Sequence, residues 1–155
     1  MDIGSKHGYP SSSLSNFAGH RFVLDDVEIY SMEGFLQSLK YKNPDMQVEV
    51  CKLIGYGAKK RGSKKNWKRE GLLYWKGKDI DRFGDEYQDL LDRAYQAMFE
   101  QSSAFRKALM STQNATLTHS IGRRKESETI LTKTEFCRRL ERLRDEAKQI
   151  DELFE

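Results

Sequence analysis

The sequence predicts a single α+β domain that is mostly helical and carries a small β-hairpin. Three observations support this fold class. The chain has 155 residues, the usual size of one domain. Its 8 Phe, 7 Tyr and 2 Trp are enough to build a core, although charged residues make up 33% of the chain. Apolar residues recur mainly at helical spacing, and there is no internal repeat or linker, so residues 1–155 are expected to form one domain.

The N-terminal part is expected to hold a loop and the hairpin. Residues 1–15 are rich in Ser and Gly and predict a loop, at least in part, and whether residues 1–13 are flexible is left open. In "HRFVLDDVEIY" the apolar residues alternate on both sides of Asp25-Asp26, which indicates a short hairpin. Ser31 can cap the helix that follows.

Five segments are expected to be helical because apolar residues recur at i, i+3, i+4 and i+7. The clearest is "DEYQDLLDRAYQAMF", and the last opens on a capping-box pattern from Thr132 to Glu135. The second is expected to begin at Pro44 and to end at Gly55. The segments are residues 31–43, 44–55, 85–99, 103–111 and 133–155. The stretch "ATLTHSIG" resembles a β-strand that ends in glycine.

The last helix carries a heptad seam that is too short for a coiled coil. The seam consists of Phe136, Leu140, Leu143, Ala147, Ile150 and Phe154. Its first half is expected to pack on the core. Residues 145–155 are a charged helical extension, which either projects from the domain or pairs with a second copy in a homodimer.

Positive charge is concentrated in one segment. Seven cations fall within eleven residues that contain no acid: Lys59, Lys60, Arg61, Lys64, Lys65, Lys68 and Arg69. The whole chain has a net charge of +3, so the rest of it is negative. Glycines interrupt the segment, which is therefore expected to form a loop with short turns. The charge suggests a polyanionic partner, namely a phosphate, a nucleotide or nucleic acid bound along Lys59–Arg69.

Several classes of protein are excluded. No apolar run approaches the roughly 20 residues that span a bilayer, and the N-terminus lacks the apolar core of a secretory signal. Cys51 and Cys137 have no partner at metal-ligand spacing, which is typical of free thiols in a reducing compartment. We therefore expect a cytoplasmic protein without a membrane partner, metal or other cofactor.

A polar stripe on residues 31–43 is the first candidate site. At 100° per residue, Gln37 and Lys40 both lie within about 40° of Glu33, opposite the apolar arc. Glu33 and Lys40 are separated by about 10.5 Å along the helix axis, and the Lys40 side chain leans back toward Glu33. Pattern alone favours a solvated outer face over the wall of an active site.

The residues around this stripe resemble a known family. "LSNFAGHRFVLDDVEIYSMEGFLQSLKY" is similar to the opening of the NADAR, or YbiA-like, family, which has an S-N-F motif, a hairpin and an E-H-Y-F-Q-A-x-K-F helix. The matching residues are Ser15-Asn16-Phe17 and Glu33 to Tyr41, with Gly34 in place of the histidine. "FRKALMST" and "LTHSIG" are similar to later blocks of a bacterial and phage branch, and the resemblance covers residues 14–144.

The resemblance implies a YbiA-like fold and an enzyme that cleaves an N-glycosidic bond. In the family, one group hydrolyses early riboflavin-pathway intermediates and another removes ADP-ribose from guanine in nucleic acid. The basic segment favours ADP-ribosylated guanine, in nucleic acid or nucleotide, as the substrate. Two alternatives stay open: an N-glycosidase for small riboflavin-pathway metabolites, and a non-catalytic module that binds ADP-ribose or a nucleotide.

The resemblance implies that Glu33 and Lys40 are the catalytic pair. A carboxylate stabilises the positive charge that builds on ribose, or acts as acid or base. Lys40 is expected to form an imine with the opened ribose, which requires the neutral amine. A tight ion pair with Glu33 would oppose this by raising the pKa of Lys40, so the two groups either stand apart or Lys40 only binds ligand oxygens.

Further ligand contacts are expected at Ser15, Asn16, Phe17, Gln37, Arg61, Trp75, His119 and Ser120. Arg61 is the preferred phosphate clamp because a guanidinium binds phosphate with two hydrogen bonds. The other six cations of the segment are expected to be solvated or to make loose contacts. Asn16 is equally compatible with a turn, Phe17 and Trp75 with core packing, and His119 with a structural hydrogen bond.

Overall fold

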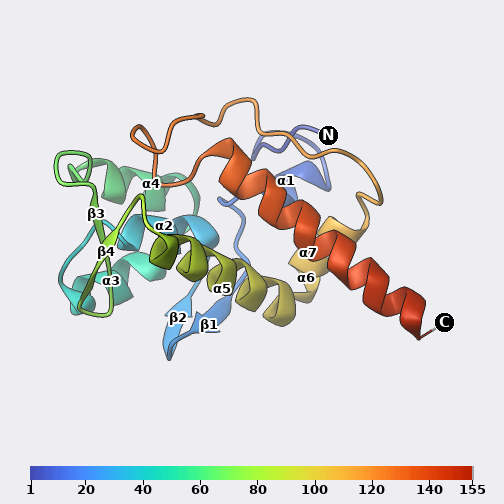
Figure 1. Cartoon of the computed structure of the whole chain (residues 1–155), viewed down its shortest axis with the longest axis horizontal. Helices are drawn as coiled ribbons and strands as arrows, with labels where there is room; N and C mark the ends of the chain where they lie inside the picture. The colour runs from blue at the N-terminus through green and yellow to red at the C-terminus, as the bar shows by residue number, and fades with distance from the viewer. Residues whose placement is uncertain (155) are drawn as a thin grey trace.

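The structure is a computed structural model of the chain, and it describes residues 1–154. Seven helices and two antiparallel hairpins make up this part of the chain (Figure 1), which confirms the predicted α+β class. The first elements are α1 (Ser11–Leu14), β1 (Phe22–Leu24), β2 (Val27–Ile29), α2 (Met32–Ser38), α3 (Pro44–Cys51) and α4 (Gly55–Ser63). They are followed by β3 (Leu72–Trp75), β4 (Lys78–Asp81), α5 (Asp85–Gln101), α6 (Ser103–Met110) and α7 (Lys133–Leu153).

The expected hairpin forms between β1 and β2, with Phe22 opposite Ile29. Asp25 and Asp26 make its turn with φ of 49° and 66°, in the left-handed region that short polar side chains tolerate better than most. The Asp25 carboxylate accepts a hydrogen bond of 2.8 Å from the Trp75 indole at the end of β3. The turn of the first hairpin is thereby tied to the second hairpin.

Helices α5 and α7 supply much of the core. The residues of α5 that carried the helical pattern, such as Tyr87, Leu91 and Ala94, are fully buried. Figure 1 shows α5 running through the middle of the molecule with α7 crossing beside it. The predicted capping box is present at the start of α7, where Thr132 and Glu135 satisfy each other's backbone N–H groups.

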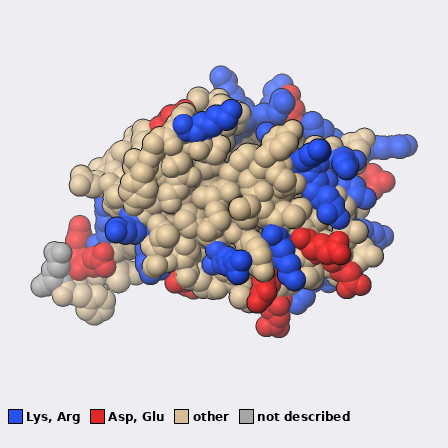
Figure 2. Space-filling view, turned by 180° about the vertical axis from the view of Figure 1, so that it is seen from behind, with Lys and Arg blue, Asp and Glu red and all other residues tan. Residues whose placement is uncertain are grey.

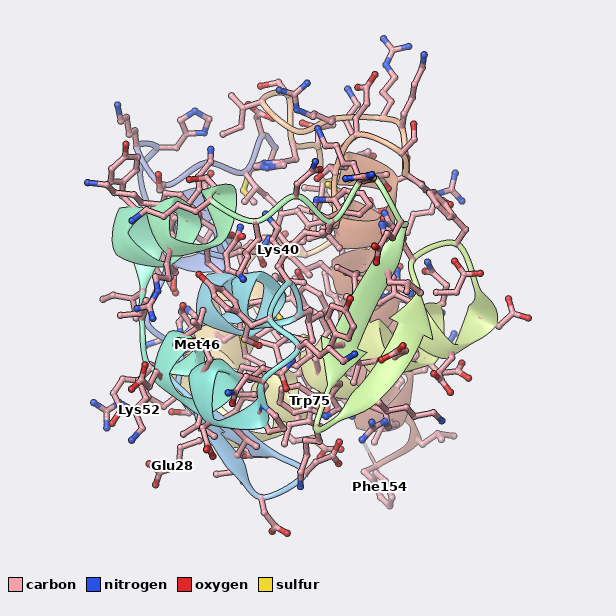
Figure 3. All side chains as sticks on the ribbon, turned by 90° about the vertical axis from the view of Figure 1, so that its left-hand side faces the viewer. Glu28, Lys40, Met46, Lys52, Trp75 and Phe154 are labelled. Carbon is pink, nitrogen blue, oxygen red and sulfur yellow. The ribbon has the colours of Figure 1, made fainter. Side chains whose placement is uncertain are left out.

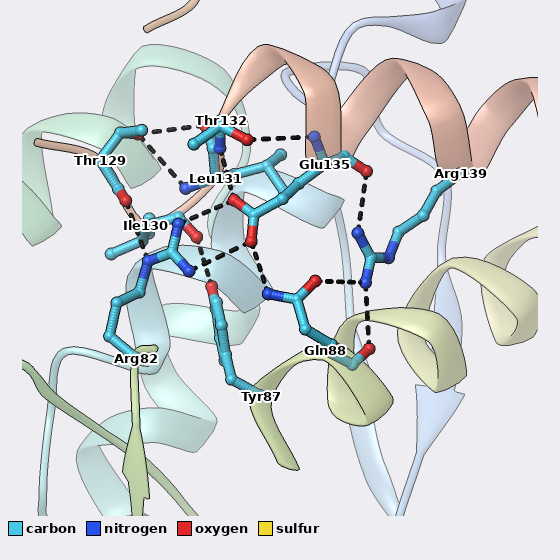
Figure 4. Close-up of polar contacts among 9 residues, drawn as sticks. All are labelled: Arg82, Tyr87, Gln88, Thr129, Ile130, Leu131, Thr132, Glu135 and Arg139. Carbon is cyan, nitrogen blue, oxygen red and sulfur yellow. Dashed lines mark hydrogen bonds and ion pairs between the residues drawn. The ribbon is translucent and has the colours of Figure 1, made fainter. Parts of the chain in front are cut away.

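A buried polar network joins the start of α7 to β4 and α5 (Figure 4). Arg82 is 0% exposed and donates two hydrogen bonds, of 2.7 and 3.1 Å, to the Glu135 carboxylate. Gln88 donates a further one of 2.7 Å to Glu135 and accepts one of 2.7 Å from Arg139. Burial alone would raise the pKa of Glu135, but the hydrogen bonds from Arg82 and Gln88 outweigh it and hold that pKa below its usual value.

Two predictions about residues 44–71 are wrong. The second helix ends at Cys51 and not at Gly55, and Gly55 instead opens α4. The first half of the basic segment is therefore helical and not a loop. The reason is tertiary: Ala58 and Gly62 are buried where α4 packs against α2, and this packing offsets the poor helix propensity of three glycines.

The second hairpin, β3–β4, was not predicted. Its turn is Lys76-Gly77, with φ of 50° and 85°, and it buries Leu73 and Ile80 on its inner side. The stretch "ATLTHSIG" forms less than a strand, since its sheet pairing is one parallel bridge between Thr118 and Asp2.

The two ends of the described chain differ in how closely they pack on the domain. The first residues are attached to the domain: Ile3 is 0% exposed and its N–H donates to the Thr118 carbonyl. The end of α7 projects from the domain (Figure 1), and Ile150 is 55% and Phe154 86% exposed. Whether this projection pairs two copies stays a prediction. Within residues 1–154, none of the helices has the length and apolar character needed to cross a membrane.

Candidate active site

A cavity of about 600 Å³ opens beside the polar stripe of α2. Its walls come from α2, the loop before β1, the C-terminal half of α4 with residues 64–68, and the segment that leads into α7. Glu33, Gln37 and Lys40 all line it, so the stripe faces a cavity and not bulk solvent. A cavity of this volume is typical of small-ligand sites.

Glu33 sits in the first turn of α2. Ser31 caps this helix by accepting a hydrogen bond of 3.0 Å from Gly34 N–H, and Glu33 N–H donates one of 2.9 Å to the Asn16 carbonyl. The Gln37 amide donates a hydrogen bond of 2.8 Å to the Glu33 carboxylate. Burial raises the pKa of Glu33, and Gln37 together with nearby cations opposes this rise only in part.

Lys40 lies just beyond the end of α2, between the ribbons of α2 and α4 (Figure 3). Its ammonium donates a hydrogen bond of 3.4 Å to the Gly62 carbonyl. Burial lowers the pKa of Lys40, the Glu33 carboxylate opposes this, and Lys68 and Lys59 add to the lowering. A lowered pKa increases the fraction of neutral, nucleophilic amine at pH 7.

Glu33 and Lys40 stand apart. In the described part of the chain, the nitrogen–oxygen pairs within 4.0 Å join other residues and not these two. Each group therefore keeps a pKa shifted toward its neutral form. The structure thus has no ion pair that would oppose a neutral amine, and whether Lys40 forms an imine or only binds ligand oxygens stays a prediction.

The S-N-F motif forms the wall beside Glu33, and Ser15, Asn16 and Phe17 all line the cavity. The Asn16 side-chain oxygen accepts a hydrogen bond of 2.8 Å from the buried Tyr95 hydroxyl, which leaves the amide N–H groups as donors for a ligand. Ser15 accepts a hydrogen bond of 3.2 Å from Phe17 N–H.

His119 also lines the cavity. Its Nδ1 lies 2.8 Å from the Ile3 carbonyl, which can only accept, so Nδ1 carries the proton. In the neutral ring Nε2 is then an acceptor. The ring packs edge-on against Phe136, with centroids 5.3 Å apart.

Three predicted ligand contacts lie outside the cavity. Arg61 extends to the far side of α4, where its guanidinium contacts Met46 and lies 3.7 Å from Glu49. Trp75 is 6% exposed and belongs to the core, and Ser120 hydrogen-bonds Asp2. The candidate site does not include these three residues.

Four cations that the sequence interpretation treated as solvated or loosely bound line the cavity: Lys59, Lys64, Lys65 and Lys68. With Lys40 and Arg123 they outnumber the lining acids Glu33 and Glu128. Figure 2 shows lysine and arginine side chains densest at the end of the molecule that carries α4 and the β3–β4 hairpin. Trp67, which is 7% exposed, lines the same cavity and takes the place expected for Trp75.

The sequence pattern did not predict that residues 129–131 form part of the cavity wall. Thr129, Ile130 and Leu131 line the cavity but come from an irregular segment. The buried network of Figure 4 holds them through their backbone: Arg82 Nε donates to the Thr129 carbonyl at 3.0 Å, and the Tyr87 hydroxyl to the Ile130 carbonyl at 2.5 Å. In residues 1–154 no cluster of three or more His, Cys, Asp or Glu is arranged to bind a metal.

The fold and the cavity define a class: a small α+β domain of YbiA-like fold with a cation-lined polar cavity. The NMR structure of the E. coli protein YbiA is similar to this chain with a TM-score of 0.63, over 99% of this chain and 86% of that one, at 16% identity. This likeness shows the fold, and it confirms the resemblance seen in the sequence.

The chain belongs to the family described as bacteriophage protein GP30.3, whose model matches residues 8–145. A relative in Enterobacteria phage T4, described as an uncharacterized 17.1 kDa protein in the Gp30-rIII intergenic region, is 37% identical over 148 residues. That alignment covers 94% of this chain and 97% of the phage protein.

Proposed function

We propose that the protein is a hydrolase that cleaves the N-glycosidic bond between ribose and a base. One observation carries the proposal: Glu33 and Lys40 face the same cavity without forming an ion pair, and burial pushes the pKa of each toward its neutral form. A neutral amine and a carboxyl that can donate and accept a proton are the groups this reaction needs.

The reaction uses the two groups in sequence. The Lys40 lone pair attacks the anomeric carbon, the C1–N bond breaks, and the base leaves with the bonding electrons and a proton from Glu33. Nζ, which became cationic on attack, then gives one proton to the ring oxygen; the C1–O bond of the ring breaks and a protonated imine forms between Nζ and C1. Water adds to this imine, with Glu33 as the base, and the free amine and the sugar are regenerated.

The preferred substrate is ADP-ribosylated guanine, in nucleic acid or as a nucleotide. The lysines and Arg123 that line the cavity supply positive charge for a pyrophosphate, and Trp67 offers an aromatic surface in the same cavity. Asn16 has free amide donors for ribose hydroxyls. A polyanion that carries a pyrophosphate uses this charge better than a small pyrimidine does.

The direct test is release of ADP-ribose from a synthetic oligonucleotide that carries ADP-ribosylated guanine, measured by mass spectrometry. The riboflavin-pathway intermediates are assayed in parallel. We expect release by the wild type and loss of about 10²-fold or more in Glu33→Gln, the scale of general acid–base catalysis. If only the riboflavin-pathway compounds are turned over, the substrate is one of them and not ADP-ribosylated guanine. If compounds bind but none is turned over, the proposal that the protein is a hydrolase is rejected.

Borohydride added during turnover tests the role of Lys40. We expect a covalent sugar adduct on Lys40, and none after Lys40→Met. Lys52→Met is the matched control because Lys52 is exposed at the end of α3, away from the cavity. An active enzyme that yields no adduct would assign Lys40 to ligand binding alone.

The proposed contact with nucleic acid predicts a strong salt dependence. If several of the lysines neutralise backbone phosphates, the affinity for an oligonucleotide falls steeply between 50 and 200 mM salt, by about 10-fold or more. An affinity that does not change with salt would restrict the partner to a nucleotide held inside the cavity.

A further inference from the structure

One glycine of α4 lies against Gln37, the hydrogen-bond partner of Glu33, and against Lys40. Gly62 is buried in the last turn of α4, where this helix packs on α2. A Cβ at Gly62 would lie 1.8 Å from the Gln37 side-chain oxygen and 2.6 Å from its amide carbon. The space that a side chain at residue 62 would fill is therefore occupied by the Gln37 amide.

The Gln37 amide is fixed in one orientation. Its nitrogen donates to the Glu33 carboxylate at 2.8 Å, and a reversed amide would set its oxygen against that carboxylate. Its oxygen, turned toward Gly62, is buried and accepts no hydrogen bond in the described structure. A buried acceptor without a donor is unfavourable for stability, so the amide is held there by packing and by its bond to Glu33.

The backbone of Gly62 contacts the second catalytic group. Its carbonyl accepts the 3.4 Å hydrogen bond from Lys40. This carbonyl lies at the C-terminal end of α4, where helix carbonyls carry partial negative charge, and it also accepts the backbone N–H groups of Lys64 and Lys65.

We propose that Gly62 is a positioning residue for the reaction: its missing side chain admits the Gln37 amide that orients Glu33, and its carbonyl orients Lys40. This inference rests on the proposed function. It explains how Glu33 and Lys40 are kept apart and oriented toward the cavity. Gly62 touches no ligand itself. Its effect on the reaction passes through Gln37, Glu33 and Lys40.

The chain offers a matched control in the same helix. A Cβ at Gly57 would meet no heavy atom within 4 Å, and neither Gly57 nor Gly62 has a positive φ. Replacing either glycine by alanine favours α4 by the same intrinsic propensity. Any difference between Gly62→Ala and Gly57→Ala therefore reports the contact with Gln37.

The first measurement needs no substrate. The pKa of Glu33 is measured by NMR of its carboxyl carbon, where Lys59, Lys40 and His119 are the charged or titratable groups that act on it. We expect Gly62→Ala to raise that pKa, because the displaced amide no longer donates to the carboxylate, and Gly57→Ala to leave it unchanged. Equal titrations in the two variants would overturn the inference, whatever the enzyme's activity.

The second measurement is kinetic, with ADP-ribosylated guanine as substrate. We expect Gly62→Ala to lower kcat by about 10²-fold, the scale of a 1 Å misplacement, while KM changes little because the cavity cations are intact. Gly57→Ala keeps the kcat of the wild type. An equal change of KM and kcat in both variants would indicate general damage and reject the positioning role.

A second variant covers the case in which Gly62→Ala does not fold. Gln37→Met keeps Gly62 and the side-chain length but removes the donor to Glu33. We expect the same rise in the pKa of Glu33 and the same selective fall in kcat. If the titrations behave as expected but no compound is turned over by the wild type, the proposed function fails while the geometry of Gly62 and Gln37 stands.

Discussion

The buried ion pair between Arg82 and Glu135 should contribute more to stability than any exposed pair of this protein. Arg82 is 0% exposed, and Glu135 is 9% exposed. Replacement of Arg82 by Met keeps most of the apolar volume and removes three hydrogen bonds, two to Glu135 and one to the Thr129 carbonyl. The substitution leaves a buried carboxylate without its cation.

The expected cost follows from these contacts. Removing one partner of a buried ion pair typically costs about 3–5 kcal/mol. Glu135 retains hydrogen bonds from Gln88 and from Thr132 N–H, so we expect the lower end, about 3 kcal/mol. For a chain of this size that corresponds to a fall in Tm of about 6–12 °C. Arg93→Met, which breaks the pair with Asp25 at a side chain 51% exposed, should cost at most about 1 kcal/mol.

Urea unfolding of Arg82→Met and Arg93→Met, followed by circular dichroism, tests this difference at pH 7. The pH dependence adds a second check, because the pKa of Glu135 is lowered in the folded state. Its contribution is complete above the unfolded pKa of about 4.3 and is lost as the pH falls through the folded pKa. The wild type and Arg82→Met should therefore converge at low pH. Equal unfolding free energies for the two variants at pH 7 would refute the reasoning.

Three further predictions follow from the site and from α7. Glu33→Gln should have a higher urea midpoint than the wild type at pH 7. The pKa of Glu33 is raised in the folded state, so the residue destabilises the fold once the pH exceeds its unfolded pKa, and a lower midpoint would contradict this. ADP-ribose should quench the fluorescence of Trp67, which lines the cavity, and the change should vanish in Trp67→Phe but persist in Trp75→Phe. If α7 pairs two copies, sedimentation should show a dimer that Ile150→Glu dissociates, and a monomer at every concentration would exclude the pairing.

The elements that the sequence predicted well are those whose signals are local. The apolar spacing in α5, the capping box at Thr132 and the alternation around Asp25-Asp26 each act within a few residues, and the structure contains all three. The stripe of Glu33 and Lys40 was visible for the same reason. The sequence did not show that this stripe faces a cavity. Periodicity shows which residues share a helix face, but not whether that face borders a cavity or bulk solvent.

The basic segment shows what local signals leave open. Its glycines predict a loop, yet packing against α2 makes residues 55–63 helical. Once the helix exists, Lys59 and Ser63 share the face that lines the cavity, and Arg61, about 200° away from Lys59, points to Glu49. The rotation of α4 therefore decides which cations of the segment face the cavity, and a loop prediction cannot supply that rotation.

The sequence by itself determined the helices with strong periodicity, the first hairpin, the capping box and the two groups proposed for catalysis. Only the tertiary structure decided which side chains share the cavity, because Thr129, His119 and Lys68 come from segments far apart in the chain. It also decided the pKa directions of Glu33 and Lys40. Burial is the largest cause of both shifts, and burial depends on every element that packs around the two groups.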